Sequence, residues 1–151
     1  MTTELTLAEL ESAAGLELEP SDWVTLDQKT IELFADATGD HQWIHVDPEA
    51  AAQGPFGTTV AHGYLSLALL PGLLGSVLSV TDARMGVNYG IEKVRFTAPV
   101  PSGSHVRLKP TIRSAERRGE GVLYHVAVEV EIEGGDKPAC VVETISRYVP
   151  A

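Results

Sequence analysis

Residues 62–78 constrain the fold more than any other part of this 151-residue chain. As a helix, this segment is apolar nearly all round, and such a helix is normally buried in a protein core. It contains His62, Ser66, Pro71 and Gly72, and it falls short of the ~20 uninterrupted apolar residues that cross a membrane. We therefore predict a buried central helix that is kinked or divided at Pro71, because proline lacks an N–H and clashes with the preceding turn.

From residue 85 onward the apolar pattern has a period of two. Apolar residues alternate with charged or polar ones over 106–113 and 122–133, and residues 139–149 form a closing strand. The pattern predicts long antiparallel strands with one buried and one largely wet face. One buried helix followed by four such strands predicts an α+β domain in which the sheet wraps the helix. Turns are marked by glycine or proline at 99–103, 118–121 and 134–136.

The length fits one domain over residues 1–151, with an N-terminal helical extension at about 1–20. Thr6 and Glu9 form a capping box that begins a short helix, which we expect to pack on the outside. Thr25 and Gln28 form a second capping box that opens a helix over about 27–38. The apolar residues of this second helix share one face, so we expect it to present the following turn from a buried side.

The turn after that helix carries the most informative residues. Gly39 is a natural helix stop, and Asp40 and His45 follow it, five residues apart. A carboxylate and an imidazole that face one gap can hold a water molecule and exchange protons with a substrate. Asp47 as N-cap and Pro48 at the first helical position then begin another short helix. A plainer interpretation is that Asp40 and His45 only cap backbone groups.

A metal site is a further alternative, because Asp40, His41 and His45 include two histidines four residues apart. However, no glutamate follows the first histidine as in the H-E-x-x-H zinc motif. Gly39 and Pro48 also argue against one continuous helix that would present both histidines on one face. We therefore predict no metal.

Residues 34–47 resemble the signature of the MaoC-like, (R)-specific enoyl-CoA hydratases, also called hydratase 2. That signature combines an aromatic residue, a small residue, Gly-Asp-x-Asn-Pro-aliphatic-His, and a small residue six places after the histidine. The matching positions here are Asp40, Ile44, His45 and Ala51. Residues 54–63 and 88–100 resemble two further segments of the family, so the resemblance covers about residues 22–149.

Two departures from the family pattern concern the surroundings of the turn. Gln42 and Trp43 stand where the family usually has Asn-Pro, and we interpret this as variation near the substrate, since glutamine still donates and accepts hydrogen bonds. Pro71 stands where many members have a serine that supports the catalytic aspartate. Ser66 lies nearer the start of the central helix, so the sequence offers no obvious supporting partner for Asp40.

The resemblance implies a single hot-dog fold that pairs as a homodimer, with the active site close to the interface. It implies that Asp40 and His45 hold the water that adds to trans-2-enoyl-CoA, giving (R)-3-hydroxyacyl-CoA reversibly without a separate cofactor. The backbone N–H of Gly63 would bind the thioester carbonyl, although Gly63 is also explained by a tight turn into the helix. Gln42 and Tyr64 are further candidates for substrate contacts. The candidate side chains for the acyl pocket are Trp43, Phe56 and Tyr64, and His62 is expected to be structural.

Two other functions stay open. A hot-dog thioesterase shares the fold but attacks the carbonyl carbon, and the adjacency of Asp40 and His45 disfavours it. A non-catalytic dimer that binds acyl-CoA is suggested by Gln42-Trp43 and by Pro71. Turnover of enoyl substrates, cleavage of saturated acyl-CoA, or binding without turnover would separate the three.

The net charge of −10 is unevenly spread. Residues 1–83 carry one lysine and 13 acidic residues, whereas residues 84–151 carry ten basic and eight acidic residues. Nucleic-acid binding is therefore not expected, and the acidic half favours free CoA thioesters over an acidic carrier protein. The phosphates of coenzyme A would use positive groups from Arg84, Lys93, Arg95, Arg107, Lys109 and Arg113.

The single cysteine, Cys140, lies in an apolar strand pattern, so we expect a buried and inert thiol. One cysteine cannot form an internal disulfide, which fits a reducing compartment. The acidic N-terminus lacks the basic and apolar regions of a signal peptide. The expected location is the cytoplasm.

Overall fold

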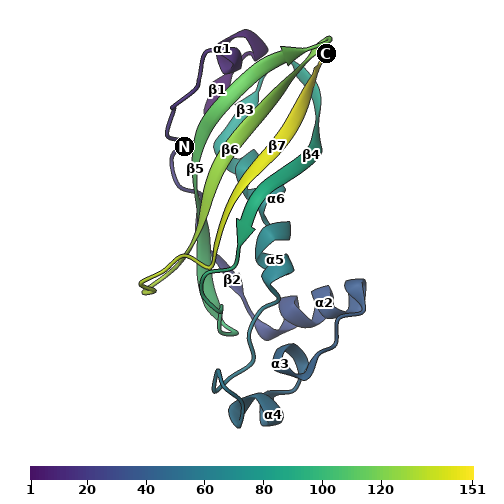
Figure 1. The fold of residues 1–151 in the computed structure, drawn as a ribbon, viewed down its shortest axis with the longest axis vertical. Helices are drawn as coiled ribbons and strands as arrows, with labels where there is room; N and C mark the ends of the chain where they lie inside the picture. Colours follow the sequence, from purple (N-terminus) through teal and green to yellow (C-terminus); the bar gives the residue numbers. More distant parts are fainter.

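The computed structural model describes residues 1–151 and has the predicted α+β architecture. In chain order the elements are β1 (Thr3–Leu5), α1 (Leu7–Glu11), β2 (Val24–Leu26), α2 (Gln28–Thr38), α3 (Trp43–Val46), α4 (Pro48–Ala52), α5 (Gly63–Ala68), α6 (Leu70–Val77), β3 (Leu78–Val80), β4 (Ala83–Arg95), β5 (Ser104–Arg118), β6 (Gly121–Ile132) and β7 (Cys140–Pro150). Helices α2 to α4 gather at one end of the molecule and α1 lies at the other (Figure 1). No helix has the length and apolar character needed to cross a membrane.

A five-stranded antiparallel sheet in the order β2-β5-β6-β7-β4 curls around α5 and α6 (Figure 1). The four long strands are those that the period-two pattern predicts. Their inward-facing side chains form the core, and several are at most 1% exposed: Val106, Leu108, Ile112, Val126, Val128 and Val130. The sheet therefore wraps the apolar helical segment, which confirms the predicted hot-dog fold.

The central apolar segment forms two helices, as its proline predicts. Helix α5 ends at Ala68 and α6 begins at Leu70, with Pro71 in the first turn of α6. Proline is tolerated there, because the backbone N–H that it lacks would have no partner within the helix. Leu65, Leu70 and Leu74 are at most 7% exposed, so both helices contribute to the core.

Helix α2 begins differently from the prediction. Asp27, not Thr25, is its N-cap, and the Asp27 side chain accepts a hydrogen bond from the backbone N–H of Thr30. Thr25 lies in strand β2, where its backbone pairs with β5. The side chain of Gln28 is therefore not used in a cap. Instead, its Nε2 donates to the carbonyl oxygen of His45 at 2.7 Å, and its Oε1 accepts from the hydroxyl of Thr59 at 2.6 Å.

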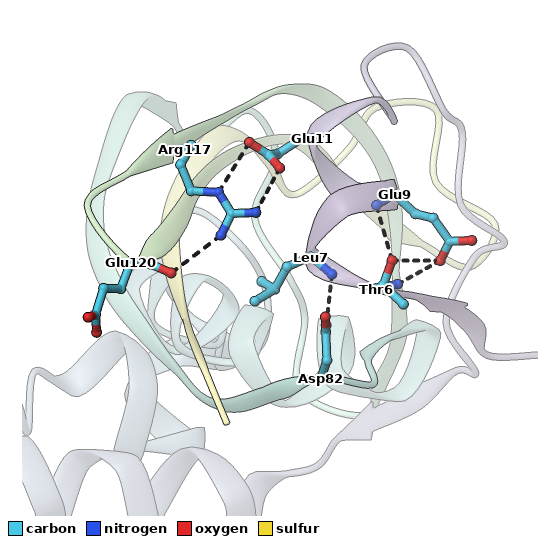
Figure 2. A network of polar contacts seen from close by, with 7 residues as sticks. All are labelled: Thr6, Leu7, Glu9, Glu11, Asp82, Arg117 and Glu120. Atoms are coloured by element: carbon cyan, nitrogen blue, oxygen red, sulfur yellow. Dashed lines mark hydrogen bonds and ion pairs between the residues drawn. The ribbon is translucent and has the colours of Figure 1, made fainter.

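The N-terminal helix α1 has the predicted capping box but not the predicted outer position. Leu7 and Leu10 are 3% and 0% exposed, so α1 packs its apolar side into the core at one end of the curled sheet. Figure 2 shows how polar contacts fix α1 there: Glu11 pairs with the guanidinium of Arg117 on β5, and the N–H of Leu7 donates to Asp82. The expectation of an outer helix was wrong because two buried leucines face the sheet.

Two features of the sheets were not predicted from the sequence. Strands β1 and β3 form a separate parallel pair, with Thr3 opposite Leu78 and Leu5 opposite Val80. Strand β4 is the long edge of the main sheet, and only one of its sides is paired, to β7. Its exposed apolar side chains, 46–63% accessible, are Met85, Val87, Tyr89 and Ile91.

Candidate active site

The turn that follows α2 places Asp40 at the surface. Gly39 adopts the left-handed conformation with φ of 81°, and its N–H donates to the carbonyl of Ala35, which ends the helix as predicted. A carboxylate oxygen of Asp40 then accepts a weak hydrogen bond of 3.3 Å from the backbone N–H of Gln42. Asp40 is exposed, so the expectation that α2 presents the turn from a buried side was wrong. The buried face of α2, with Ile31 and Ala35, ends before the turn.

His45 lies on the short helix α3 and is 7% exposed. Its Nδ1 lies 2.6 Å from the carbonyl oxygen of Val60. A carbonyl oxygen can only accept a hydrogen bond, so Nδ1 carries the proton and Nε2 is left without one in the neutral ring. The Gln28 amide also holds the backbone carbonyl of His45. His45 is therefore fixed in one tautomer, with a nitrogen free to take up a proton.

Asp40, His45 and His62 come together in space. One carboxylate oxygen of Asp40 and one ring nitrogen of each histidine all lie within 4.8 Å of one another. The Nε2 of His62 donates to the backbone carbonyl of Asp40 at 3.0 Å, and the His62 ring stacks on His45 with centroids 3.9 Å apart and planes 22° apart. Asp40 and His45 were predicted from the sequence, whereas His62 was expected to be structural. The sequence signal for His62 was only its position beside Gly63.

The structure does not gather the metal-ligand set considered from the sequence. His41 is exposed and its Nε2 contacts Asp36 at 2.9 Å, a hydrogen bond that raises the pKa of His41. The histidine beside the dyad is His62, whose ring is stacked on His45. In stacked rings the in-plane lone pairs run side by side and do not converge on one ion, whereas a zinc site needs converging ligands. That no metal takes part stays a prediction.

Gly63 begins α5 and lines a cleft of about 330 Å³ together with His45 and Ser66. Its backbone N–H has no hydrogen-bond partner within the chain. A Cβ atom at this position would lie 3.0 Å from the ring of Phe96, so the packing admits only glycine without movement. The other cleft walls are mostly apolar and include Ile44, Phe56, Val60, Ala61 and Val100.

Of the remaining candidate residues, one lines this cleft and three do not. Phe56 lines it, but Trp43 packs on Gly54, where an added Cβ would lie 2.9 Å from the indole. Tyr64 is 70% exposed and contacts Phe96 edge to face. Gln42 is the N-cap residue of α3, and its side chain makes no capping hydrogen bond.

Ser66 and Pro71 line two different cavities in the structure. Ser66 is 2% exposed and lines the cleft of His45, although its place early in the helix gave no clear direction. Pro71 lines a different cavity of about 480 Å³, between the central helices and strands β4 and β7. Asn88 and Thr144 also line this cavity, and the Thr144 hydroxyl is buried without a hydrogen-bond partner.

The positive residues considered for coenzyme A fall into two groups. Arg107 and Lys109 both pair with Glu131 on the outer face of the sheet, so one carboxylate already offsets part of their positive charge. The other four form no ion pair with a carboxylate within the chain: Arg84, Lys93, Arg95 and Arg113. These four are the better candidates for phosphate contacts.

Comparisons with known proteins find a matching family, similar sequences and a similar fold. A family model described as "MaoC like domain" matches residues 9–133. The "3-hydroxyacyl-thioester dehydratase Z" of Mycobacterium tuberculosis is 54% identical over 150 residues, covering 99% of each chain. "Nodulation protein N" of Rhizobium leguminosarum bv. viciae is 46% identical over 154 residues, covering 97% of this chain and 94% of that protein. The unliganded R-hydratase PhaJ1 of Pseudomonas aeruginosa has a TM-score of 0.78 at 25% identity, covering 97% of this chain and 87% of that one.

A sheet curled around a divided apolar helix, with a carboxylate and an imidazole beside an apolar cleft, defines a hot-dog protein with a candidate acid–base site. Because the domain match covers most of the chain and close relatives match nearly all of it, the chain belongs to the MaoC-like dehydratase family. It is an enzyme of the hydratase and dehydratase class. The resemblance found in residues 34–47 is thus confirmed, and the non-catalytic alternative is set aside.

Proposed function

We propose that the enzyme adds water to trans-2-enoyl-CoA to give (R)-3-hydroxyacyl-CoA, and that it also catalyses the reverse dehydration. The observation that carries this proposal is the free Nε2 of His45, which lines an apolar cleft within reach of the Asp40 carboxylate. Two acid–base groups that share one water suit a reaction in which one proton leaves water and another reaches the substrate. The name of the relative that is 54% identical, a 3-hydroxyacyl-thioester dehydratase, supports the same class of substrate.

The proposed reaction proceeds in three steps. The water oxygen forms a bond to Cβ while one of its protons passes to the dyad of Asp40 and His45. The electron pair of the C=C bond moves through Cα to the thioester carbonyl, giving an enolate. A proton from the dyad then reaches Cα, so that H and OH have been added and the dyad is restored. Because the two groups interact closely, we assign the acid and base roles to the pair.

The enolate oxygen needs a hydrogen-bond donor. The unpartnered N–H of Gly63 lines the same cleft as His45 and is the proposed donor. One such preorganised donor typically contributes about 3–4 kcal/mol to the stability of the transition state. The absence of a side chain at Gly63 leaves room for Phe96 to pack directly on the backbone.

The acyl part of the substrate is proposed to lie against the apolar walls of the cleft, near Phe56 and Ile44. Ser66 is the only hydroxyl of the central helix in this cleft, and it is proposed to face the bound substrate. Phosphates of CoA are proposed to use cations of the second half of the chain, such as Arg95, which has no carboxylate partner within the chain and precedes the cleft residue Phe96.

The proposed active form is a homodimer. Strand β4 leaves one edge of the main sheet unpaired, and it exposes four large apolar side chains. Natural proteins normally cover such an edge, since unpaired backbone groups beside apolar side chains promote association. Pairing of β4 with the same strand of a second copy would extend the sheet and bury these side chains.

The proposed function is tested by following the conjugated enoyl-thioester absorbance with trans-2-enoyl-CoAs of short and medium length, together with free-thiol release. The expected result is rapid loss of absorbance, formation of the (R)-3-hydroxyacyl product, and no release of CoA. Release of CoA from saturated acyl-CoA would favour the thioesterase alternative. Absence of turnover by the folded protein on either substrate class would overturn the proposed function.

A further inference from the structure

We propose that His62 is a positioning residue, which holds the backbone of Asp40 and the ring of His45 in the arrangement that the reaction needs. This inference rests on the proposed function, because it concerns the same pair of groups. His62 touches both of them from the N-cap of α5, 22 residues after Asp40 and 17 after His45.

The first contact ties down the turn that carries Asp40. A carbonyl oxygen only accepts, so the 3.0 Å contact means that Nε2 of His62 carries the proton and donates to Asp40. Asp40 is exposed and follows a left-handed glycine, where helical hydrogen bonds have ended. Its own N–H makes only a 3.4 Å contact, with the hydroxyl of Thr38. The bond from His62 is therefore the main constraint on the Asp40 backbone from outside its own turn.

The second contact sets the plane of the His45 ring. The hydrogen bond from Nδ1 of His45 to Val60 fixes the tautomer, but a single bond leaves the ring free to rotate about its direction. The His62 ring lies 3.9 Å away and nearly parallel, which restricts that rotation. Phe34 packs on His62 in turn, with ring centroids 4.9 Å apart. The plane of His45 therefore depends on a stack that begins on helix α2.

The unpaired nitrogen of His62 argues against a purely space-filling role. His62 is 3% exposed, and its Nδ1 is buried without a hydrogen-bond partner. Buried polar atoms are nearly always paired, so an unpaired one needs an explanation. Phenylalanine would fill a similar volume without an unsatisfied atom. A histidine is useful here because it combines a flat ring for His45 with a donor for Asp40.

Two variants separate these contacts. His62→Phe keeps a ring that can stack on His45 but removes the donor to Asp40, whereas His62→Gln keeps an amide donor and removes the ring. His105→Gln is the matched control, since the His105 side chain is half exposed on β5 and its one ion-pair contact is with Glu133 at 3.6 Å. Each protein is measured for kcat and KM on trans-2-enoyl-CoA and for its thermal unfolding midpoint.

Both His62 variants are expected to lower kcat by about 10- to 10²-fold, because small misplacement of reacting groups has effects of this size. KM is expected to change by less than about threefold, since substrate binding is largely retained. His62→Phe is expected to unfold at or above the wild-type temperature, and His105→Gln to keep the wild-type kcat. Wild-type kcat in both folded His62 variants would overturn the inference, and so would a loss of kcat explained by unfolding.

Two further measurements separate failure of this inference from failure of the proposed function. Asp40→Asn in the same assay tests the dyad alone: full activity in that variant contradicts the dyad, whatever His62 does. A crystal structure of His62→Phe tests positioning without any assay. The expected result is a displaced Asp40 carbonyl and a longer distance from the Asp40 carboxylate to His45. A turn that superposes on the wild type would overturn the positioning role.

Discussion

At the residue scale, the site depends on side chains that link separate elements. Gln28, from the first turn of α2, holds the carbonyl of His45 on α3 and the hydroxyl of Thr59 in the loop between α4 and α5. The local sequence shows Asp40 and His45, because their spacing and residue types form a recognisable motif. The roles of Gln28 and His62 follow only from tertiary contacts, which no local pattern encodes. For that reason the sequence predicted a helix cap for Gln28.

Gly63→Ala tests the close packing around the proposed enolate donor. The added methyl group would lie 3.0 Å from the Phe96 ring, so either the ring or the start of α5 must move. We expect kcat to fall at least about 10-fold, because the N–H would be displaced from the substrate oxygen. The control is Gly75→Ala in α6, where a Cβ meets nothing within 4 Å. If steady-state kinetics show equal kcat in both variants, Gly63 is not the donor.

Burial of Cys140 gives the stability a defined pH dependence. Burial raises the pKa of this thiol from its ordinary value of 9.0 to about 11. The unfolded chain therefore loses the thiol proton first, and the contribution of Cys140 to stability is lost as the pH rises from about 9 to 11. We expect the free energy of unfolding to fall by up to about 1.4 kcal/mol per pH unit more in the wild type than in Cys140→Ala. Urea unfolding at several pH values measures this difference, and equal slopes would contradict it.

At the element scale, long periodic segments were predictable, and so were the short helices α1 and α4, whose caps the sequence shows. The alternation over 106–113 and 122–133 defined β5 and β6, and Pro71 marked the division of the central helix. Strands β1 and β3 have three residues each, too few to show a period, and they were missed. The capping box of α1 was predicted correctly, but its burial was not, because a cap specifies where a helix begins and not what it packs against.

Leu10→Ala tests the conclusion that α1 belongs to the core. Leu10 is fully buried, so its truncation leaves a cavity in the core where α1 packs against the sheet. We expect a loss of about 2–5 kcal/mol in the free energy of unfolding, measured by urea denaturation. Leu33→Ala on α2 is the control, since Leu33 is 60% exposed and should change stability by less than about 0.5 kcal/mol. Similar small effects of both substitutions would show that α1 is peripheral.

At the scale of the whole molecule, the fold leaves one surface unexplained within a single chain. The edge of β4 is long, unpaired on one side and apolar, whereas the opposite edge of the sheet is the short strand β2. The family resemblance found in the sequence implied pairing with a second copy. It did not identify which strand forms the exposed edge, because strand order depends on tertiary pairing.

A charge placed on this edge is expected to separate the proposed dimer. Val87 and Ile91 are 46% and 49% exposed on β4, so lysine at both positions would add repulsion across paired edges without opening the core. We expect light scattering after size exclusion to give a dimer mass for the wild type and a monomer mass for the double variant. Lysine in place of exposed Leu33 serves as the control. A monomeric wild type, or a double variant that stays dimeric, would contradict pairing through β4.

The central claim is that Asp40 and His45 act together on one water. Its most direct test is the rate of enoyl-CoA hydration by the wild type, Asp40→Asn and His45→Gln, with product configuration and unfolding temperature measured for each. We predict rapid formation of the (R) product by the wild type and rates at least about 10²-fold lower in each folded variant. A rate within a few-fold of wild type in either variant, or an (S) product from the wild type, would contradict the claim.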